Sequence, residues 1–422
     1  MLTLAARYVF PVEGPPIANG RVSVEDGRIV GVRGPDDGGP APDLDLGNAA
    51  ITPGFVNAHT HLDLDPIGPA PAGGTEDEVA WLSKVVAARR GQPVGSGTLA
   101  SVRNVAEASR LGTTLLADTT AAGQSWEAVA AAPLRAVVFH ELIGLNRLRG
   151  LETSGSAFDW LAAVDPAGLD PAAPPPANFK TRAGLSPHAP YSTAGWLYHR
   201  AATSRRPLST HLAEMPEELE LLETRQGPLR GFLEGLGAWD PDWEPIGSRP
   251  ADYLRKGDNR QADWIVAHGN YLPPEDFWQL RPQAASDGQR VAVAYCPRTH
   301  ARFGHAPHPY RAMLERGVIV CLGTDSLASS PTLGILDEAR FLHARDGGVG
   351  GALLLTMATL FGAWALRLDH LTGSLKVGKS ADLAVIPLPD RDDPDPHALL
   401  LESDLPVLAT MYQGGFVHGP YL

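Results

Sequence analysis

Two histidines separated by one residue, His59 and His61, are the first candidates for chemistry in this sequence. Side chains alternate along a β-strand, so residues i and i+2 point to the same side and both imidazoles would face one site. Two such nitrogens supply half of a zinc- or iron-type centre. The pair alone carries little weight, because the chain has 14 histidines and this spacing also arises by chance.

Three later segments supply what the pair lacks. His211 lies in STHLAE, His268 in VAHG and Asp325 in LGTDS, each at or near the end of a short apolar run. With the first pair they predict a divalent-metal site that has three neutral nitrogens and one carboxylate. The predicted ligands are His59, His61, His211 and Asp325.

The same segments offer the groups that a hydrolytic reaction needs. A divalent metal lowers the pKa of its bound water from 15.7 toward ~7, which supplies a nucleophile at neutral pH. Asp325 could bind the metal and also orient the water. Glu214, three residues after His211, could carry a proton from the water to a ring nitrogen and then to a departing amine. His268 could polarise the water.

The predicted ligands belong to a regular series of short apolar strands. Helix-like segments, such as residues 97–111, separate most of them. Strands that alternate with helices form parallel sheets, and eight such units predict a closed (β/α)8 barrel whose active site lies at the C-terminal ends of the strands. The eight segments are AITPGFVNAHTH, TTLLADT, LRAVVFHEL, TRAGLSPH, PLSTHLAE, WIVAHG, RVAVAYCP and GVIVCLGTDS.

Both ends of the chain are β-rich. The segment RVSVEDGRIVGVRG contains an Asp26-Gly27 turn that is typical of a hairpin, and GSLKVGKSADLAVIPL and DLPVLATMYQGGFVHG are strand-like. We therefore expect residues 1–52 and 372–422 to form one small β-sandwich, and residues 53–371 to form the catalytic barrel. A chain of 422 residues accommodates both, since such a barrel takes ~250 residues.

Two segments fall outside this pattern. Residues 166–178, PAGLDPAAPPPAN, are rich in proline and alanine and predict a surface loop. Residues 215–258 form an insertion with an acidic helix and a tryptophan-containing loop. This insertion is either a cover over the mouth of the barrel or a packed outer helix and loop.

Composition excludes several classes of protein. The net charge of −13 and the absence of Lys/Arg blocks argue against binding to nucleic acid or to an anionic membrane. We see no signal peptide and no apolar run of about 18 residues, so we expect a cytoplasmic protein. Two cysteines, Cys296 and Cys321, are predicted core residues in a reducing compartment. The expected partners are a small substrate and water, with a homodimer left open.

Six motifs resemble, in order and spacing, those of the amidohydrolase superfamily, and above all its branch of cytosine, guanine, S-adenosylhomocysteine and triazine deaminases. The resemblance implies one metal per chain, usually zinc and sometimes iron, on the four ligands above. It implies Glu214 as general acid/base, His268 as the partner of the water and His188 as a substrate contact. The motifs are PGFVNAHTHLD, SPHAPYS, STHLAEMPEE, VAHGNYL, CLGTDSLASS and GSLKVGKSADLAVI.

Within this branch, GTDSLASS followed by LGILDEAR resembles the deaminases of 6-aminodeoxyfutalosine, which act in menaquinone biosynthesis. That resemblance implies hydrolytic deamination of a 6-aminopurine nucleoside. S-adenosylhomocysteine, methylthioadenosine and guanine deaminases are the alternatives. One departure is CPRTH, where His300 replaces the asparagine that the branch commonly has. The replacement puts contacts with the distal part of the substrate in doubt.

Three other functions stay open. Triazine chlorohydrolysis uses nearly the same site. Cyclic amidases typically hold two metals that a carbamylated lysine on the fourth strand bridges. Here that strand ends in Ser186-Pro187-His188 and Lys180 lies at its other end, which favours one metal and deamination. A non-catalytic metal-binding scaffold is the third alternative, although every catalytic position is filled.

Two further residues could contact a substrate. Trp81, on a helix-like segment, could stack on a flat heterocycle or pack in the core. Glu141, at the end of the third strand, could contact the substrate or form an ion pair with Arg147 or Arg149.

The segment that follows the seventh strand is rich in cationic and imidazole side chains. Arg298 and Arg302 could bind a substrate carboxylate in bidentate fashion or lie on the surface. His300, His305 and His308 could hold a second metal. A solvated loop or a loop at the pocket rim is the favoured interpretation, because their spacing is irregular and no cysteine or carboxylate joins them.

Overall fold

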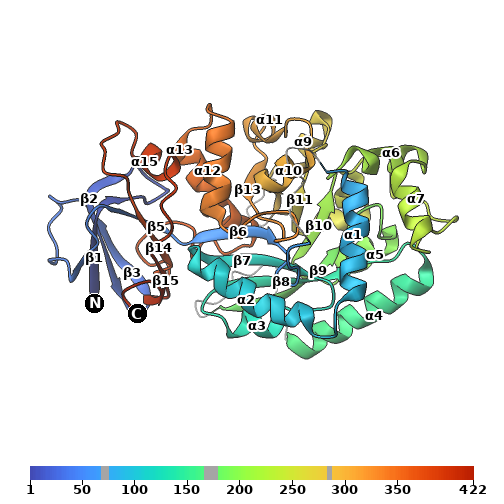
Figure 1. The fold of residues 1–422 in the computed structure, drawn as a ribbon, viewed down its shortest axis with the longest axis horizontal. Coiled ribbons are helices and arrows are strands. Elements are labelled where there is room, and N and C mark those ends of the chain that lie inside the picture. The colour runs from blue at the N-terminus through green and yellow to red at the C-terminus, as the bar shows by residue number, and fades with distance from the viewer. Residues whose placement is uncertain (68–75, 166–178, 283–287) are drawn as a thin grey trace.

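The computed structural model describes residues 1–67, 76–165, 179–282 and 288–422. It contains a parallel barrel and, beside it, a mixed sheet to which both ends of the chain contribute (Figure 1). The predicted loop at 166–178 lies outside the described residues. Among the described residues, no helix is long and apolar enough to cross a membrane.

Eight parallel strands form the barrel in chain order. They confirm the predicted (β/α)8 fold, and nearly all their residues are buried, as expected of a parallel sheet covered by helices. The first predicted segment splits at Gly54, because its first half pairs with the terminal sheet. The strands are β6 (Phe55–Thr60), β7 (Thr113–Thr120), β8 (Arg135–Leu142), β9 (Thr181–Pro187), β10 (Leu208–Leu212), β11 (Trp264–His268), β12 (Val291–Tyr295) and β13 (Ile319–Leu322).

Helices follow each strand and surround the barrel (Figure 1). The helix predicted at 97–111 is α2, whose buried Ala100, Val105 and Ala108 form its inner face. The helices before β10 are α1 (Glu78–Gly91), α2 (Ser96–Arg110), α3 (Trp126–Ala131), α4 (Arg147–Val164) and α5 (Gly195–Thr203). Those after β11 are η2 (Pro274–Asp276), α9 (Phe277–Leu280), α10 (Pro297–Phe303), α11 (Tyr310–Glu315), α12 (Ile335–Arg345), α13 (Gly351–Met357) and α14 (Leu360–Ala365).

The barrel closes through the turn that follows β13. The backbone N–H groups of Thr324 and Asp325 both donate to the carbonyl of His59 on β6, at 3.0 and 3.1 Å. The Thr60 hydroxyl donates to the Asp325 carbonyl at 2.9 Å. The first and last strands are therefore joined at the level of two predicted metal ligands.

The ends of the chain form one mixed eight-stranded sheet with its own apolar core. The hairpin predicted at Asp26-Gly27 joins β2 to β3, and both turn residues have positive φ, as that turn type requires. The sheet contains β1 (Leu2–Val9), β2 (Ile17–Glu25), β3 (Arg28–Arg33), β4 (Leu44–Asp45), β5 (Ala49–Pro53), β14 (Leu383–Pro387), β15 (Ala409–Tyr412) and β16 (Gly415–His418). The exact domain boundaries, 52/53 and 371/372, stay predictions.

The insertion after β10 is packed against the barrel rather than standing apart from it. It contains α6 (Pro216–Thr224), α7 (Pro228–Gly235), α8 (Asp252–Arg255) and the 3-10 helix η1 (Gly257–Gln261). Leu221, Leu229, Leu233 and Trp243 are buried within the main core. The structure thus shows the packed alternative, with α6 and α7 forming an outer layer (Figure 1).

Candidate active site

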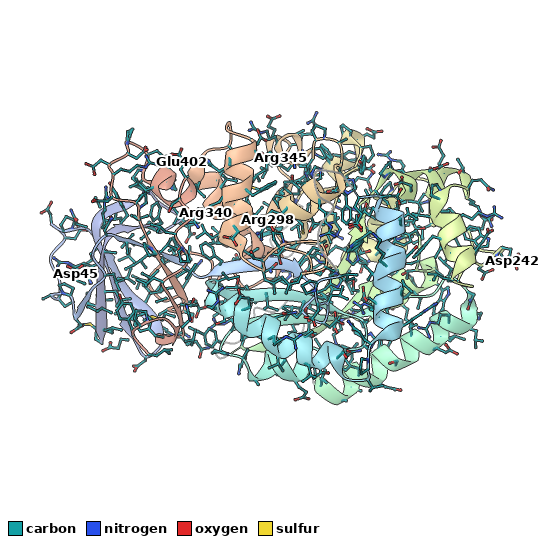
Figure 2. The ribbon with its side chains drawn as sticks, in the orientation of Figure 1. Asp45, Asp242, Arg298, Arg340, Arg345 and Glu402 are labelled. Atoms are coloured by element: carbon teal, nitrogen blue, oxygen red, sulfur yellow. The ribbon has the colours of Figure 1, made fainter. Side chains whose placement is uncertain are left out.

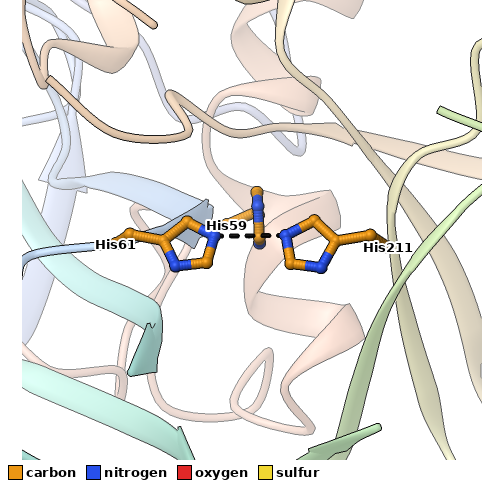
Figure 3. Close-up of side chains that lie close together, drawn as sticks. All are labelled: His59, His61 and His211. Atoms are coloured by element: carbon orange, nitrogen blue, oxygen red, sulfur yellow. Dashed lines mark hydrogen bonds between the residues drawn. The ribbon is translucent and has the colours of Figure 1, made fainter. Parts of the chain in front are cut away.

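Three imidazoles from two distant strands converge at the C-terminal end of the barrel. His61 follows β6 directly and His211 lies on β10, and their rings face each other in parallel beside His59 (Figure 3). The Nε2 atoms of His61 and His211 lie 3.1 Å apart. Two nitrogens bound ~2.0 Å from one tetrahedral zinc ion would be ~3.3 Å apart, so this spacing suits a shared metal.

The protonation of these imidazoles also fits a metal site. His211 Nδ1 lies 2.9 Å from the His188 carbonyl, to which it must donate, and this leaves the Nε2 lone pair free for a ligand. Neither ring nitrogen of buried His59 has a hydrogen-bond partner among the described residues. Burial, with the neighbouring histidines, lowers the pKa of His59 and His61 well below its usual value, so both are neutral.

Asp325 completes the predicted ligand set. Its Oδ1 lies 3.8 Å from His59 Nε2 and 3.7 Å from His61 Nε2. Its Oδ2 accepts a hydrogen bond from the Ser329 hydroxyl at 2.5 Å, which orients the carboxylate. Burial raises the pKa of Asp325 to about 7, a cost that a bound cation would offset.

Glu214 and His268 form a pair beside this cluster. His268 Nε2 lies 3.1 Å from Glu214 Oε1, and both side chains are almost fully buried. Burial and then the charges of Glu78 and Asp325 raise the pKa of Glu214 well above its usual value. The carboxyl group therefore favours its protonated form, which can donate a proton to a substrate nitrogen.

Three residues at the ends of these strands have left-handed backbone conformations. The φ angles are 51° for Ala213, 66° for His268 and 56° for Asp325. Such values are unfavourable for residues other than glycine and persist where surrounding contacts hold them, commonly at functional sites. Buried Glu218 is one such contact, since its carboxylate accepts from the N–H groups of Ala213 and Glu214 at 3.0 and 3.3 Å.

Glu78 and His305 also lie at the site, although no pattern in the sequence connects either residue with Glu214. Glu78, the first residue of α1, is buried, and neither carboxylate oxygen has a hydrogen-bond partner among the described residues. Its Oε2 lies 3.3 Å from His305 Nε2, and its charge acts on Glu214 and Asp325. The clue in the sequence was weak: an acidic residue one turn before Trp81 on an expected helix.

His188 and Glu141 lie close together beside the cluster, and their role as substrate contacts stays a prediction. His188 Nε2 lies 3.8 Å from Glu141 Oε1, beside His211. Burial lowers the pKa of His188 to about 4 and raises that of Glu141. The alternative ion pairs of Glu141 do not form, because Arg149 pairs with Glu152 and Arg147 lies over a tryptophan ring.

Trp81 packs in a small apolar cluster, with its ring edge-on to Phe303 at 5.0 Å. Its buried indole N–H has no hydrogen-bond partner among the described residues. Core packing is thus the observed role of Trp81, and stacking on a substrate stays a prediction.

Arg298 has strong protein partners in this structure, and its role as a substrate contact stays a prediction. Arg298, labelled in Figure 2, lies on α10. Its Nε donates to buried Glu338 on α12 at 2.7 Å, which joins the two helices, and its Nη2 donates to the Thr332 carbonyl at 2.9 Å. Arg302 is likewise paired, with Glu76 at 2.9 Å. The guanidinium of Arg298 pairs with Glu338, and the sequence alone does not show that Glu338 is buried or that it lies opposite Arg298.

The histidine-rich segment is not solvated, whereas His305 does lie beside Glu78 at the candidate site. His300, His305 and His308 are all largely buried. His300 Nε2 lies 2.9 Å from the Ala306 carbonyl and His308 Nε2 lies 2.8 Å from the His268 carbonyl. None of the three joins a potential metal-binding group among the described residues.

A (β/α)8 barrel with histidines and an aspartate at the C-terminal ends of its strands defines a class of metal-site hydrolases. The chain belongs to the amidohydrolase family, whose model matches residues 50–417. It is a hydrolase that acts on C–N bonds other than peptide bonds. Cys296 and Cys321 are free and buried, as predicted of core residues.

Three known proteins illustrate the similarity. A 5-methylthioadenosine/S-adenosylhomocysteine deaminase of Moorella thermoacetica is 28% identical over 415 residues, covering 90% of this chain and 83% of that protein. The structure of Helicobacter pylori aminofutalosine deaminase in complex with methylthio-coformycin has a TM-score of 0.80 at 22% identity. The match covers 99% of this chain and 100% of that one. An adenosine deaminase of Xanthomonas campestris with bound zinc has a TM-score of 0.76 at 22% identity. That match covers 99% of this chain and 93% of the other.

Proposed function

We propose that this protein deaminates a 6-aminopurine nucleoside by hydrolysis. The observation that carries the proposal is the contact between Glu214 and His268 beside the His59, His61, His211 and Asp325 cluster. Deamination of an amidine carbon needs a nucleophilic water, a proton for the ring nitrogen and a second proton for the leaving amine. One carboxyl group next to the water site can supply both transfers.

The cluster suits one divalent ion, and zinc fits three neutral imidazoles and a carboxylate better than the hard cations do. Zinc is bound in the adenosine deaminase of similar fold, and iron is the other candidate. Bound there, the ion would supply a water that ionises near neutral pH. The absence of lysine from the end of β9, which reads Ser186-Pro187, favours a single ion because no side chain there can bridge two.

The chain's own groups then divide the work. Protonated Glu214 donates its proton to the ring nitrogen as the water oxygen bonds to the amino-bearing carbon. The carboxylate that remains takes one proton of the water and passes it to the amino group, which leaves as ammonia. As the carbonyl forms, the second proton of the former water returns to Glu214 and restores its protonated form. His268 holds the water in line through its Nε2, 3.1 Å from Glu214, and Asp325 accepts the second hydrogen bond of that water.

A nucleoside substrate is supported by the polar groups around the cluster. The Glu78 carboxylate, buried beside His305 and Glu214, can accept hydrogen bonds from sugar hydroxyls. His188 and Glu141 offer a second polar edge on the other side of His211. The similar proteins from Moorella and Helicobacter are named for deamination of adenine-type nucleosides.

Among these nucleosides we favour 6-aminodeoxyfutalosine, a substrate of menaquinone biosynthesis that carries an aryl carboxylate. Arg298 is occupied, but Arg89 on α1 is available. Among the described residues its hydrogen-bond partner is Asp63, to which Nη2 donates at 3.4 Å. Its side chain is 28% exposed, and its charge acts on His188. A bidentate contact with an aryl carboxylate would suit this guanidinium.

The test is ammonia release by the zinc-loaded protein from adenosine, methylthioadenosine, S-adenosylhomocysteine, aminodeoxyfutalosine, guanine and a chlorotriazine. We expect turnover of adenine nucleosides, with the highest kcat/KM on aminodeoxyfutalosine. If methylthioadenosine were the best substrate, the assignment to menaquinone biosynthesis would be wrong, but hydrolytic deamination of a 6-aminopurine nucleoside would still hold. The proposal would be overturned if no adenine nucleoside were turned over and the protein instead released chloride from the chlorotriazine or ammonia from guanine.

A further inference from the structure

His268 is held in an unfavourable backbone conformation at the end of β11. Its φ of 66° is followed by a second left-handed residue, Gly269, at 65°. A strand end of this shape turns the His268 ring back over the barrel, where its Nε2 meets Glu214. One hydrogen bond supports this conformation from the neighbouring strand β10: the Gly269 N–H donates to the Leu212 carbonyl at 3.0 Å. The carbonyl of His268 itself needs a donor as well.

That donor is a side chain from a different loop. His308 Nε2 lies 2.8 Å from the His268 carbonyl oxygen, and since a carbonyl only accepts, the imidazole donates. The His308 ring is 8% exposed and stacks on Tyr295 with ring centroids 3.9 Å apart. Burial lowers the pKa of His308 to about 3, so the ring stays neutral with its proton on Nε2. Stacking on Tyr295 thus fixes the position and orientation of the His308 ring, and burial keeps its donor proton on Nε2.

We propose that His308 is a positioning residue for the deamination reaction: its hydrogen bond holds the His268 peptide in the left-handed conformation that aims the His268 imidazole at Glu214. The inference rests on the role of His268 in the proposed function. Without the donor, the His268 carbonyl is buried and unsatisfied, and the peptide rotates toward an ordinary strand conformation. Among the described residues, His308 belongs to no candidate metal group, and its Nε2 hydrogen bond is to the His268 carbonyl.

Two substitutions separate the hydrogen bond from the packing of the ring. His308→Phe keeps a ring against Tyr295 and removes the donor, whereas His308→Gln places an amide N–H near the position of Nε2. We expect kcat to fall about 10- to 100-fold in H308F, the range seen when a supporting residue of a metal site is lost, with KM changed less than about threefold. H308Q should regain most of kcat. Zinc content should stay at the wild-type level in both variants.

His300 provides the matched control. It is also buried, lies on α10 just before the loop that carries His308, and likewise bonds a backbone carbonyl, but that carbonyl belongs to Ala306. His300→Phe should keep kcat within about threefold of the wild type. If H308F does not fold, His308→Leu also removes the donor and serves in its place.

A crystal structure of H308F gives a readout that does not depend on activity. We expect the φ of His268 to become negative and the distance between its Nε2 and Glu214 Oε1 to exceed 3.5 Å. Retention of the positive φ and of the 3.1 Å contact would overturn the proposal. Wild-type kcat in H308F, or an equal loss in H308Q, would also overturn it. A wild-type protein inactive on every nucleoside would instead refute the proposed function.

Discussion

The backbone N–H of Asp325 donates to the carbonyl oxygen of His59 across the seam where the barrel closes, with an N–O distance of 3.1 Å. The side chains of the same two residues meet at 3.8 Å in the predicted metal site. Closure of the barrel and assembly of the ligand set are thus one event, because the last ligand is carried by the turn that joins the last strand to the first. A chain with a disordered seam would hold only an incomplete site.

Glu214→Gln should abolish turnover while zinc stays bound. Glutamine fills the same space but cannot transfer a proton, so we expect kcat to fall by about 10²- to 10⁴-fold. Ammonia release and metal analysis of the purified variant provide the measurement. Glu220→Gln, at an exposed position on α6, should behave like the wild type. A fully active E214Q would show that another group moves the protons.

Removal of a ligand should remove the metal. The wild type should contain close to one equivalent of zinc per chain, and His211→Ala should contain far less, since two nitrogens and a carboxylate bind more weakly than four ligands. Elemental analysis after dialysis measures both. His199→Ala, which changes an exposed histidine, is the control. Two equivalents in the wild type would contradict the single-metal assignment and point to a second ion on Glu141 and His188.

Substitution of Glu78 should affect nucleosides more than free bases. Glu78→Gln weakens a charge-assisted contact to a sugar hydroxyl, worth about 1.5–3 kcal/mol, so KM for the nucleoside should rise about 10-fold or more. The measurement is steady-state kinetics on adenosine, with adenine as the substrate that lacks the sugar. An equal change for both substrates would assign Glu78 to the electrostatics of Glu214 rather than to the sugar.

The pH dependence of stability should reveal buried Glu218. Burial raises its folded pKa from 4.5 to about 8, so the folded chain binds this proton more tightly than the unfolded chain does. Its contribution to stability is therefore greatest below pH 4.5 and is lost as the pH rises to about 8. Relative to Glu218→Gln, the free energy of unfolding of the wild type should fall by up to about 1.4 kcal/mol per pH unit across this window. Urea unfolding at several pH values measures it, and a constant difference would contradict the raised pKa.

Arg298→Met should destabilise the fold and leave substrate binding intact. It leaves fully buried Glu338 without its cation, and breaking a buried pair in this way costs about 3–5 kcal/mol. Urea unfolding measures the loss, and the double variant R298M/E338Q should recover part of it. A KM for aminodeoxyfutalosine raised more than 10-fold, at unchanged stability, would instead show that Arg298 binds the substrate.

Local patterns in the sequence determined the barrel and its ligand set. Each of the eight strands is a short buried run with its own boundary signals, and parallel strands of one barrel present their C-terminal ends on one face. His59, His61, His211 and Asp325 could therefore be placed together without knowing any long-range contact. Glu214 followed from its distance to the end of β10.

Only the tertiary structure decided which side chains surround that set. Glu78 reaches the site because the first turn of α1 lies beside His305, and no spacing in the sequence relates it to Glu214. The partner of Arg298 was equally hidden, since Glu338 lies on a helix 40 residues away. The periodicity of apolar residues predicts which face of a helix or strand is buried. Which side chain lies opposite a buried charged group depends on how separate helices and strands pack together. His308 and the carbonyl of His268 meet for that reason alone.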